Sequence, residues 1–149
     1  MVSTKVKGTT MAEKYEGFSA DEKAAMKQRA RELKDEARRA DGLTTLLEAI
    51  AAMDGDDRIA ATRIHEIVTE VAPQLSPKTW YGFPSYAKDD KVVIFFQPGS
   101  KFKTRYSTLG FQDTAQLDDG TMWPTAYAIT ELSPADEKRI AEIVKRAAG

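Results

Sequence analysis

The segment from Lys78 to Tyr86 constrains the fold more than any other part of the chain. It reads Lys-Thr-Trp-Tyr-Gly-Phe-Pro-Ser-Tyr, and the continuous apolar run Val92–Phe96 follows it closely. A short run that is apolar at every position is typical of a strand covered on both faces, so Val92–Phe96 is expected at the centre of a sheet. Because proline cannot donate to a strand ladder, Pro84 predicts an edge or corner element.

Further strand signals follow the apolar run. Asp89-Asp90 and Pro98-Gly99 are turn pairs. Alternation from Lys101 to Phe111 predicts a strand with cations on one face. After a turn at Leu117–Gly120, the segment Met122–Thr130 predicts a last strand. Connections as short as these predict an antiparallel sheet.

Segments with helical periodicity precede and follow the predicted strands in the sequence. From Asp57 to Ala72 apolar residues recur at helical spacing, and Pro73 ends the pattern. Residues 133–148 show the same spacing after Ser133, which is the expected N-cap. Asp41-Gly42 predicts a helix end, with a short helix Leu43–Met53 after it. Amphipathic helices need an apolar surface to pack on. The chain is therefore predicted to be an α+β two-layer sandwich, an antiparallel sheet with helices packed on one face.

The N-terminal part differs in composition from the rest. Residues 1–17 are polar without a helical or strand period, which predicts a disordered tail. Residues 18–40 are expected to form a charged helix with a capping box at Ser19 and Glu22. Residues 41–149 are expected to form the α+β domain. The helix, at about 19–39, is interpreted either as a solvated helix with charge pairs or as a surface for a protein partner.

Composition excludes several classes of protein and site. The 149 residues carry a formal net charge of −1, which argues against an overall attraction to nucleic acid. The chain has no cysteine, so disulfides, thiolate metal sites and cysteine nucleophiles are excluded. No apolar stretch has the length of a membrane span or the pattern of a signal peptide. A cytoplasmic protein without a membrane partner is the expectation.

Aromatic and basic residues of the strand region form the first candidate site. Aromatic rings with a few cations suit a pocket for a small anionic ligand. In the alternative interpretation the rings belong to the core and the cations to a solvated sheet face. The candidate residues are Trp80, Tyr81, Tyr86, Lys101, Lys103, Arg105, Tyr106 and Trp123.

Carboxylates in turns form a second candidate site, for a metal ion. Hard oxygen ligands can hold iron or magnesium weakly, but turn formation and helix capping explain the same residues. The candidate ligands are Asp54, Asp56, Asp57, Asp118 and Asp119, with Asp89-Asp90 as a further pair. The single histidine, His65, is expected to flank or lie outside the buried face of its helix. No nucleophile has a recognisable base beside it, so no catalytic residue is assigned and a non-enzymatic role is favoured.

The segment Thr79–Tyr86 resembles a motif of the YdhG-like family, domain of unknown function 1801. In that family a Trp-Tyr-Gly-Met/Phe-Pro-x-Tyr type strand-turn follows a short helix ending in Ala-Pro, here Ala72-Pro73. The likeness continues through Val92–Phe96, the segment Lys101–Arg105 and the closing helix, over about residues 43–148. The resemblance implies a frataxin-like layout of helices on one face of an antiparallel sheet.

The same resemblance implies a role in iron or metal handling, because some members are called intracellular iron chaperones. In frataxin-like proteins that role rests on acidic surface residues near a helix and the first strand. The acidic group that this chain offers is Asp54, Asp56, Asp57, Glu66 and Glu70. Three functions are therefore open: metal or iron handling, binding of a small anionic ligand, and a protein–protein interaction module.

Overall fold

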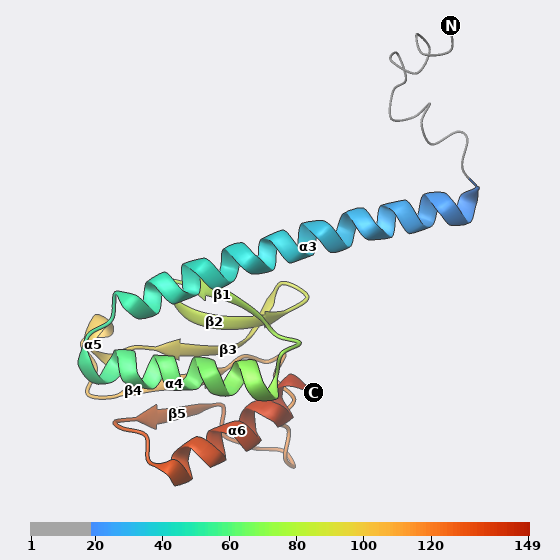
Figure 1. Ribbon diagram of the computed structural model, residues 1–149. Coiled ribbons are helices and arrows are strands. Elements are labelled where there is room, and N and C mark those ends of the chain that lie inside the picture. Colours follow the sequence, from blue (N-terminus) through green and yellow to red (C-terminus); the bar gives the residue numbers. More distant parts are fainter. Residues whose placement is uncertain (1–18) are drawn as a thin grey trace, which may run out of the picture. The chain divides into compact units, whose positions relative to one another are not determined.

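The computed structural model of the chain describes residues 19–149 (Figure 1). The chain divides into two units, Met1–Arg38 and Arg39–Gly149. The predicted tail at residues 1–17 lies outside the described residues. The described elements are α3 (Ala20–Ala51), α4 (Gly55–Val71), β1 (Ser76–Trp80), β2 (Phe83–Lys88), β3 (Lys91–Gln97), α5 (Gly99–Phe102), β4 (Ser107–Phe111), β5 (Ala126–Ile129) and α6 (Pro134–Ala148). They confirm the predicted α+β fold with an antiparallel sheet.

The described part of the first unit is the charged beginning of α3. The predicted capping box is present: the Ser19 N–H donates to Glu22 Oε1 over 3.3 Å, and the Glu22 N–H donates to Ser19 Oγ over 3.1 Å. Along the helix, Arg29 lies 3.4 Å from Glu32 and 3.9 Å from Glu36. These pairs are exposed, so they contribute little to stability.

The predicted helix end at Asp41-Gly42 is wrong, because α3 continues to Ala51. A glycine inside a helix costs about 1 kcal/mol relative to alanine. Here a Cβ on Gly42 would lie 2.1 Å from the carbonyl oxygen of Pro77, so no larger residue fits. Arg39 fixes the same approach by donating to Pro73 O over 2.7 Å and to Ser76 Oγ over 3.3 Å. Gly42 therefore lets α3 come close to the backbone of β1.

The sheet has the strand order β1-β2-β3-β4-β5, and every neighbouring pair is antiparallel. Two-residue turns close its first two hairpins. Tyr81 and Gly82 have φ of 52° and 80°, and Asp89 and Asp90 have φ of 51° and 64°. Two positive φ angles in succession are typical of the hairpin turn whose twist matches that of the strands. The predicted turn at Asp89-Asp90 is confirmed.

The position of Pro84 corrects the edge prediction. Strand β2 lies inside the sheet, between β1 and β3. Pro84 pairs with Thr79 of β1, whereas pairing with β3 begins only at Ser85, which lies opposite Phe95. Because Pro84 stands before the β3 ladder begins, its missing N–H removes no bond to β3. The edge strand on this side is β1.

The predicted strand Lys101–Phe111 is present only in its second half. Residues 99–102 form the short helix α5, Lys103 ends it with a φ of 56°, and β4 begins at Ser107. The three cations predicted on one strand face therefore do not share a strand. The last strand is also shorter than predicted, since β5 spans Ala126–Ile129 only.

The main core lies between one sheet face and the helices. Side chains of α4 and α6 pack with those of the last turns of α3 against β2, β3, β4 and β5. The largest fully buried members are Tyr86, Phe96, Leu46, Ile64, Leu75, Ile94, Leu109, Val68, Val93 and Val144. Within residues 19–149, no helix is both long and apolar enough to cross a membrane.

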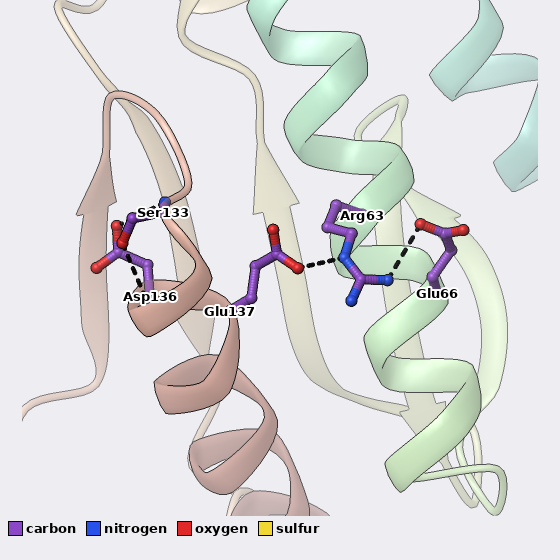
Figure 2. Close-up of polar contacts among 5 residues, drawn as sticks. All are labelled: Arg63, Glu66, Ser133, Asp136 and Glu137. Carbon is purple, nitrogen blue, oxygen red and sulfur yellow. Dashed lines mark hydrogen bonds and ion pairs between the residues drawn. The ribbon is translucent and has the colours of Figure 1, made fainter.

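Polar contacts fix α6 at its start and along α4 (Figure 2). Ser133 Oγ accepts from the Asp136 N–H over 3.1 Å, and the Asp136 carboxylate accepts from the Ser133 N–H over 3.0 Å, so the N-cap predicted from the sequence is a full capping box. Arg63 of α4 donates through Nε to Glu137 of α6 and through Nη1 to Glu66 over 3.3 Å. The guanidinium thus ties the two helices together.

Candidate ligand-binding site

An aromatic cluster lies at one end of the sheet, on the face that points away from α4 and α6. Neighbouring residues of a strand point to opposite faces. Tyr86 lies in the helix-covered core, so Phe83 and Ser85 point the other way, together with their partners Trp80 and Phe95. The cluster consists of Trp80, Tyr81, Phe83, Phe95 and Phe102. It forms a second, smaller apolar group at one end of the sheet.

The rings of this cluster meet at angles typical of aromatic packing. The Trp80 and Phe95 centroids lie 5.4 Å apart, and Phe83 lies 5.6 Å from Phe95 and 5.7 Å from Phe102. The Phe95 ring lies over Gly110, where a Cβ would come within 2.1 Å of it. Edge-to-face and tilted pairs are favourable at these separations. The cluster is therefore a packed unit, in which Phe83 is buried and the outer rings are partly exposed.

Tyr81 is the exposed tip of the cluster. Its side chain is 75% exposed, and its ring centroid lies 4.9 Å from that of Trp80. Its φ of 52° is left-handed, a conformation that costs an L-residue roughly 1–2 kcal/mol. The hairpin turn requires this φ, so the angle is explained by the turn itself. Tyr81 is a candidate contact residue because its ring is exposed beside Trp80.

Lys101 places an ammonium group beside the same turn. Its Nζ donates to the carbonyl oxygen of Gly82 over 3.2 Å and lies 5.7 Å from the centroid of the Phe102 ring. Among residues 19–149, no carboxylate forms an ion pair with it. An ammonium has three N–H donors, so donors remain for a ligand. The site thus holds a positive charge that no side chain of the described residues neutralises.

A cavity of about 360 Å³ opens beside this ammonium. Binding pockets for small molecules are mostly apolar with a few placed polar groups, and this volume lies in their range. Apolar side chains from the end of α3 and from the β3–α5 connection form part of the wall: Ala49, Ala52, Met53 and Pro98. The remaining wall is Asp54, Asp57, Gly82, Ser100 and Lys101.

The two carboxylates of the cavity differ in their surroundings. Asp57 is half-buried and accepts from the Ser100 N–H over 3.1 Å and from Ser107 Oγ over 3.0 Å. These bonds hold α5 and the start of β4 against the first turn of α4, which explains why the predicted strand is interrupted there. Asp54 is exposed, and its side chain makes no capping hydrogen bond to α4. Asp54 therefore keeps a carboxylate available at the cavity.

The structure brings together only part of the predicted aromatic and basic site. Trp80, Tyr81 and Lys101 meet at the β1–β2 turn. Lys103 and Arg105 are exposed in the connection from α5 to β4, and the Arg105 guanidinium lies 5.4 Å from the ring of Tyr106. Trp123 packs against the main core instead. The cluster members missing from the prediction are Phe83, Phe95 and Phe102.

Tyr86 lies on the other face of the sheet, so its assignment to this site is wrong. It is 2% exposed, and its hydroxyl lies 2.9 Å from Nδ1 of His65. Burial raises the pKa of Tyr86 well above its usual value of 10.0. Burial also lowers the pKa of His65, against the opposing charge of Glu66. His65 itself is half-buried, and its hydrogen bond satisfies the hydroxyl of the core tyrosine.

The carboxylates predicted as metal ligands are spread over separate places. Asp54 and Asp57 line the cavity beside Lys101, Asp56 lines one between α4 and α6, and Asp118 lies by Trp123. Asp119 is exposed. Within the described part of the chain, no three His, Asp or Glu side chains are grouped so as to hold a metal ion.

Comparison of the chain with protein-family models, with curated proteins and with solved structures gives no significant match. The resemblance to the YdhG-like family, and with it the frataxin-like layout, therefore stays a prediction.

Proposed function

We propose that the protein is a non-enzymatic binding protein whose cavity beside Lys101 takes up a small ligand through an anionic group of that ligand. One observation supports this proposal above the others. The Lys101 ammonium is held by the Gly82 carbonyl at the wall of a cavity, and no carboxylate of the described residues pairs with it. An anion that binds there gains a charge-assisted hydrogen bond.

The surroundings favour an anion with an apolar body. Ala49, Ala52, Met53 and Pro98 offer apolar side chains in its lining. Burying apolar surface contributes about 25 cal/mol per Å². An organic acid with a hydrocarbon or aromatic part therefore suits the site better than a bare inorganic anion.

The test is a titration of the ¹⁵N-labelled protein with 3-phenylpropionate, followed by amide NMR. We expect shifts at Gly82, Ser100 and Lys101, and a loss of affinity of about tenfold in Lys101→Met, because one charge-assisted bond is removed. Lys103→Met is the matched control, since Lys103 is exposed and does not line the cavity. Equal affinity in Lys101→Met, or an equal loss in the control, would contradict the proposal.

Iron or metal handling and a protein partner for residues 19–39 stay predictions. No contact among the described residues adds to the resemblance and the charge pattern on which they rest.

A further inference from the structure

We infer that the ligand of this cavity is a zwitterion, an amino-acid-like molecule with its acidic group at Lys101 and its ammonium group at Asp54. The inference rests on the proposed function and adds a second charge to the ligand. It comes from the charges that line this one cavity: one cation, Lys101, and two carboxylates, Asp54 and Asp57.

The two carboxylates have different tasks. Asp57 already accepts two hydrogen bonds, from Ser100 and Ser107, and holds the connection between β3 and β4 in place. Asp54 has neither a capping bond nor an ion pair within residues 19–149. A carboxylate left free beside a cavity can accept from an ammonium group of a ligand. The free acceptor and the free donor thus line the same cavity.

The balance of charge points the same way. A ligand that carries only a negative charge would bring a third anion to a cavity with two carboxylates and one ammonium. Like charges close together are unfavourable, and the effect grows where the cavity excludes water. A zwitterion can pair with both the Lys101 ammonium and the Asp54 carboxylate, and it adds no net charge. Ala49, Ala52 and Met53 then face the apolar part of the ligand.

Three probes of nearly the same shape test this arrangement: L-phenylalanine, 3-phenylpropionate, which lacks the amine, and 2-phenylethylamine, which lacks the carboxylate. Affinities come from amide NMR titrations of the full chain. We expect L-phenylalanine to bind about tenfold more tightly than either other probe, since each of them loses one charge-assisted contact. The shifts should include the amides of Asp54 and Lys101.

A substitution at Asp54 supplies the second arm. In Asp54→Asn the preference for L-phenylalanine over 3-phenylpropionate should disappear, while binding of 3-phenylpropionate is kept or improved. Asp56→Asn is the matched control, because Asp56 lines a different cavity and is also exposed to solvent. It should keep the full preference. The amide spectrum of each variant shows whether the fold is retained.

The outcomes separate this inference from the proposed function. If 3-phenylpropionate binds as tightly as L-phenylalanine, and Lys101→Met weakens it, the zwitterion is wrong and the anion site stands. If Asp54→Asn keeps the preference, the amine does not lie at Asp54 and the inference also fails. If no probe shifts the cavity amides, or if only 2-phenylethylamine does, the proposed function is wrong as well.

Discussion

Nδ1 of His65 lies 2.9 Å from the hydroxyl oxygen of Tyr86, and the two rings stack with their centroids 5.9 Å apart. This pair joins α4 to β2 through the core. A hydroxyl as deeply buried as that of Tyr86 requires a partner in the protein. The neutral imidazole and the protonated phenol supply one donor and one acceptor in either tautomer. The only histidine of the chain therefore has a structural task.

Truncating the two partners should have unequal effects. Tyr86→Phe leaves His65 half-buried and able to reach water, so we expect a loss of about 1 kcal/mol in the free energy of unfolding. His65→Ala strands the buried hydroxyl and removes the stacked ring, so we expect a larger loss, about 2–3 kcal/mol. Urea denaturation measures both. A smaller loss for His65→Ala than for Tyr86→Phe would show that the Tyr86 hydroxyl does not depend on His65 as its hydrogen-bond partner.

The same pair predicts a dependence of stability on pH. Burial lowers the pKa of His65 below its usual value of 6.5, so on acidification the unfolded chain takes up the proton first. Stability from the neutral imidazole is thus complete above pH 6.5 and is lost as the pH falls through that value toward the folded pKa. The stability advantage of the wild type over His65→Gln should therefore shrink between about pH 7.5 and 5.5. An advantage that is constant over this range would contradict the lowered pKa.

Gly42 should resist the substitution that usually strengthens a helix. Gly→Ala inside a helix gains about 1 kcal/mol on average. At Gly42 the new methyl group would meet the Pro77 carbonyl oxygen, which is backbone and cannot turn away. We expect Gly42→Ala to destabilise by about 1–3 kcal/mol, as overpacking does. Ala40→Gly, at an exposed position of the same helix, serves as the control and should cost about 1 kcal/mol. Stabilisation by Gly42→Ala would mean that α3 and β1 are not in close contact.

Elements with a strong local signal could be predicted from the sequence. The stripe from Ala60 to Val71 predicts α4 to within two residues, and Ser133 with Asp136 predicts the start of α6. The Asp89-Asp90 turn also follows from its own residues. In each case the pattern and the tertiary contacts favour the same structure. The class of the fold follows from the order of these elements.

Elements decided by distant contacts could not be predicted. Gly42 resembles a helix end until Pro77 is known to lie against it, and Lys101–Phe111 alternates like a strand although Asp57 holds its first part in a turn. The candidate site could likewise be predicted only in part. Trp80, Tyr81 and Lys101 could be proposed, whereas Phe83 and Phe95 look like ordinary core residues until the register of the sheet shows which face they share.

Asp57 should matter for stability far more than its neighbour. Asp57→Ala leaves the Ser100 N–H and the Ser107 hydroxyl without their acceptor, and Ser107 is buried. We expect a loss of about 1–3 kcal/mol in the free energy of unfolding. Asp56→Ala, the control, removes an exposed carboxylate and should change stability by less than about 0.5 kcal/mol. Urea denaturation distinguishes the two, and equal effects would show that the Asp57 bonds do not hold the β3–β4 connection.

Gly82 links the shape of the hairpin turn to the position of the Lys101 ammonium. It has a φ of +80°, and a Cβ there would lie 2.5 Å from Lys101 Nζ. Gly120 has a similar φ of +71° with no atom within 4 Å of such a Cβ, so it is a matched control. We expect Gly82→Ala and Gly120→Ala to lose similar stability, about 1 kcal/mol or more, because both strain the backbone.

The two variants should differ in ligand binding. The Lys101 side chain can swing away from a methyl group at Gly82, so the clash adds little to the loss of stability but displaces the ammonium. Binding of 3-phenylpropionate, followed by amide NMR, should weaken in Gly82→Ala and stay unchanged in Gly120→Ala. Equal binding by the two variants would show that the anion does not depend on where the Gly82 carbonyl holds Lys101.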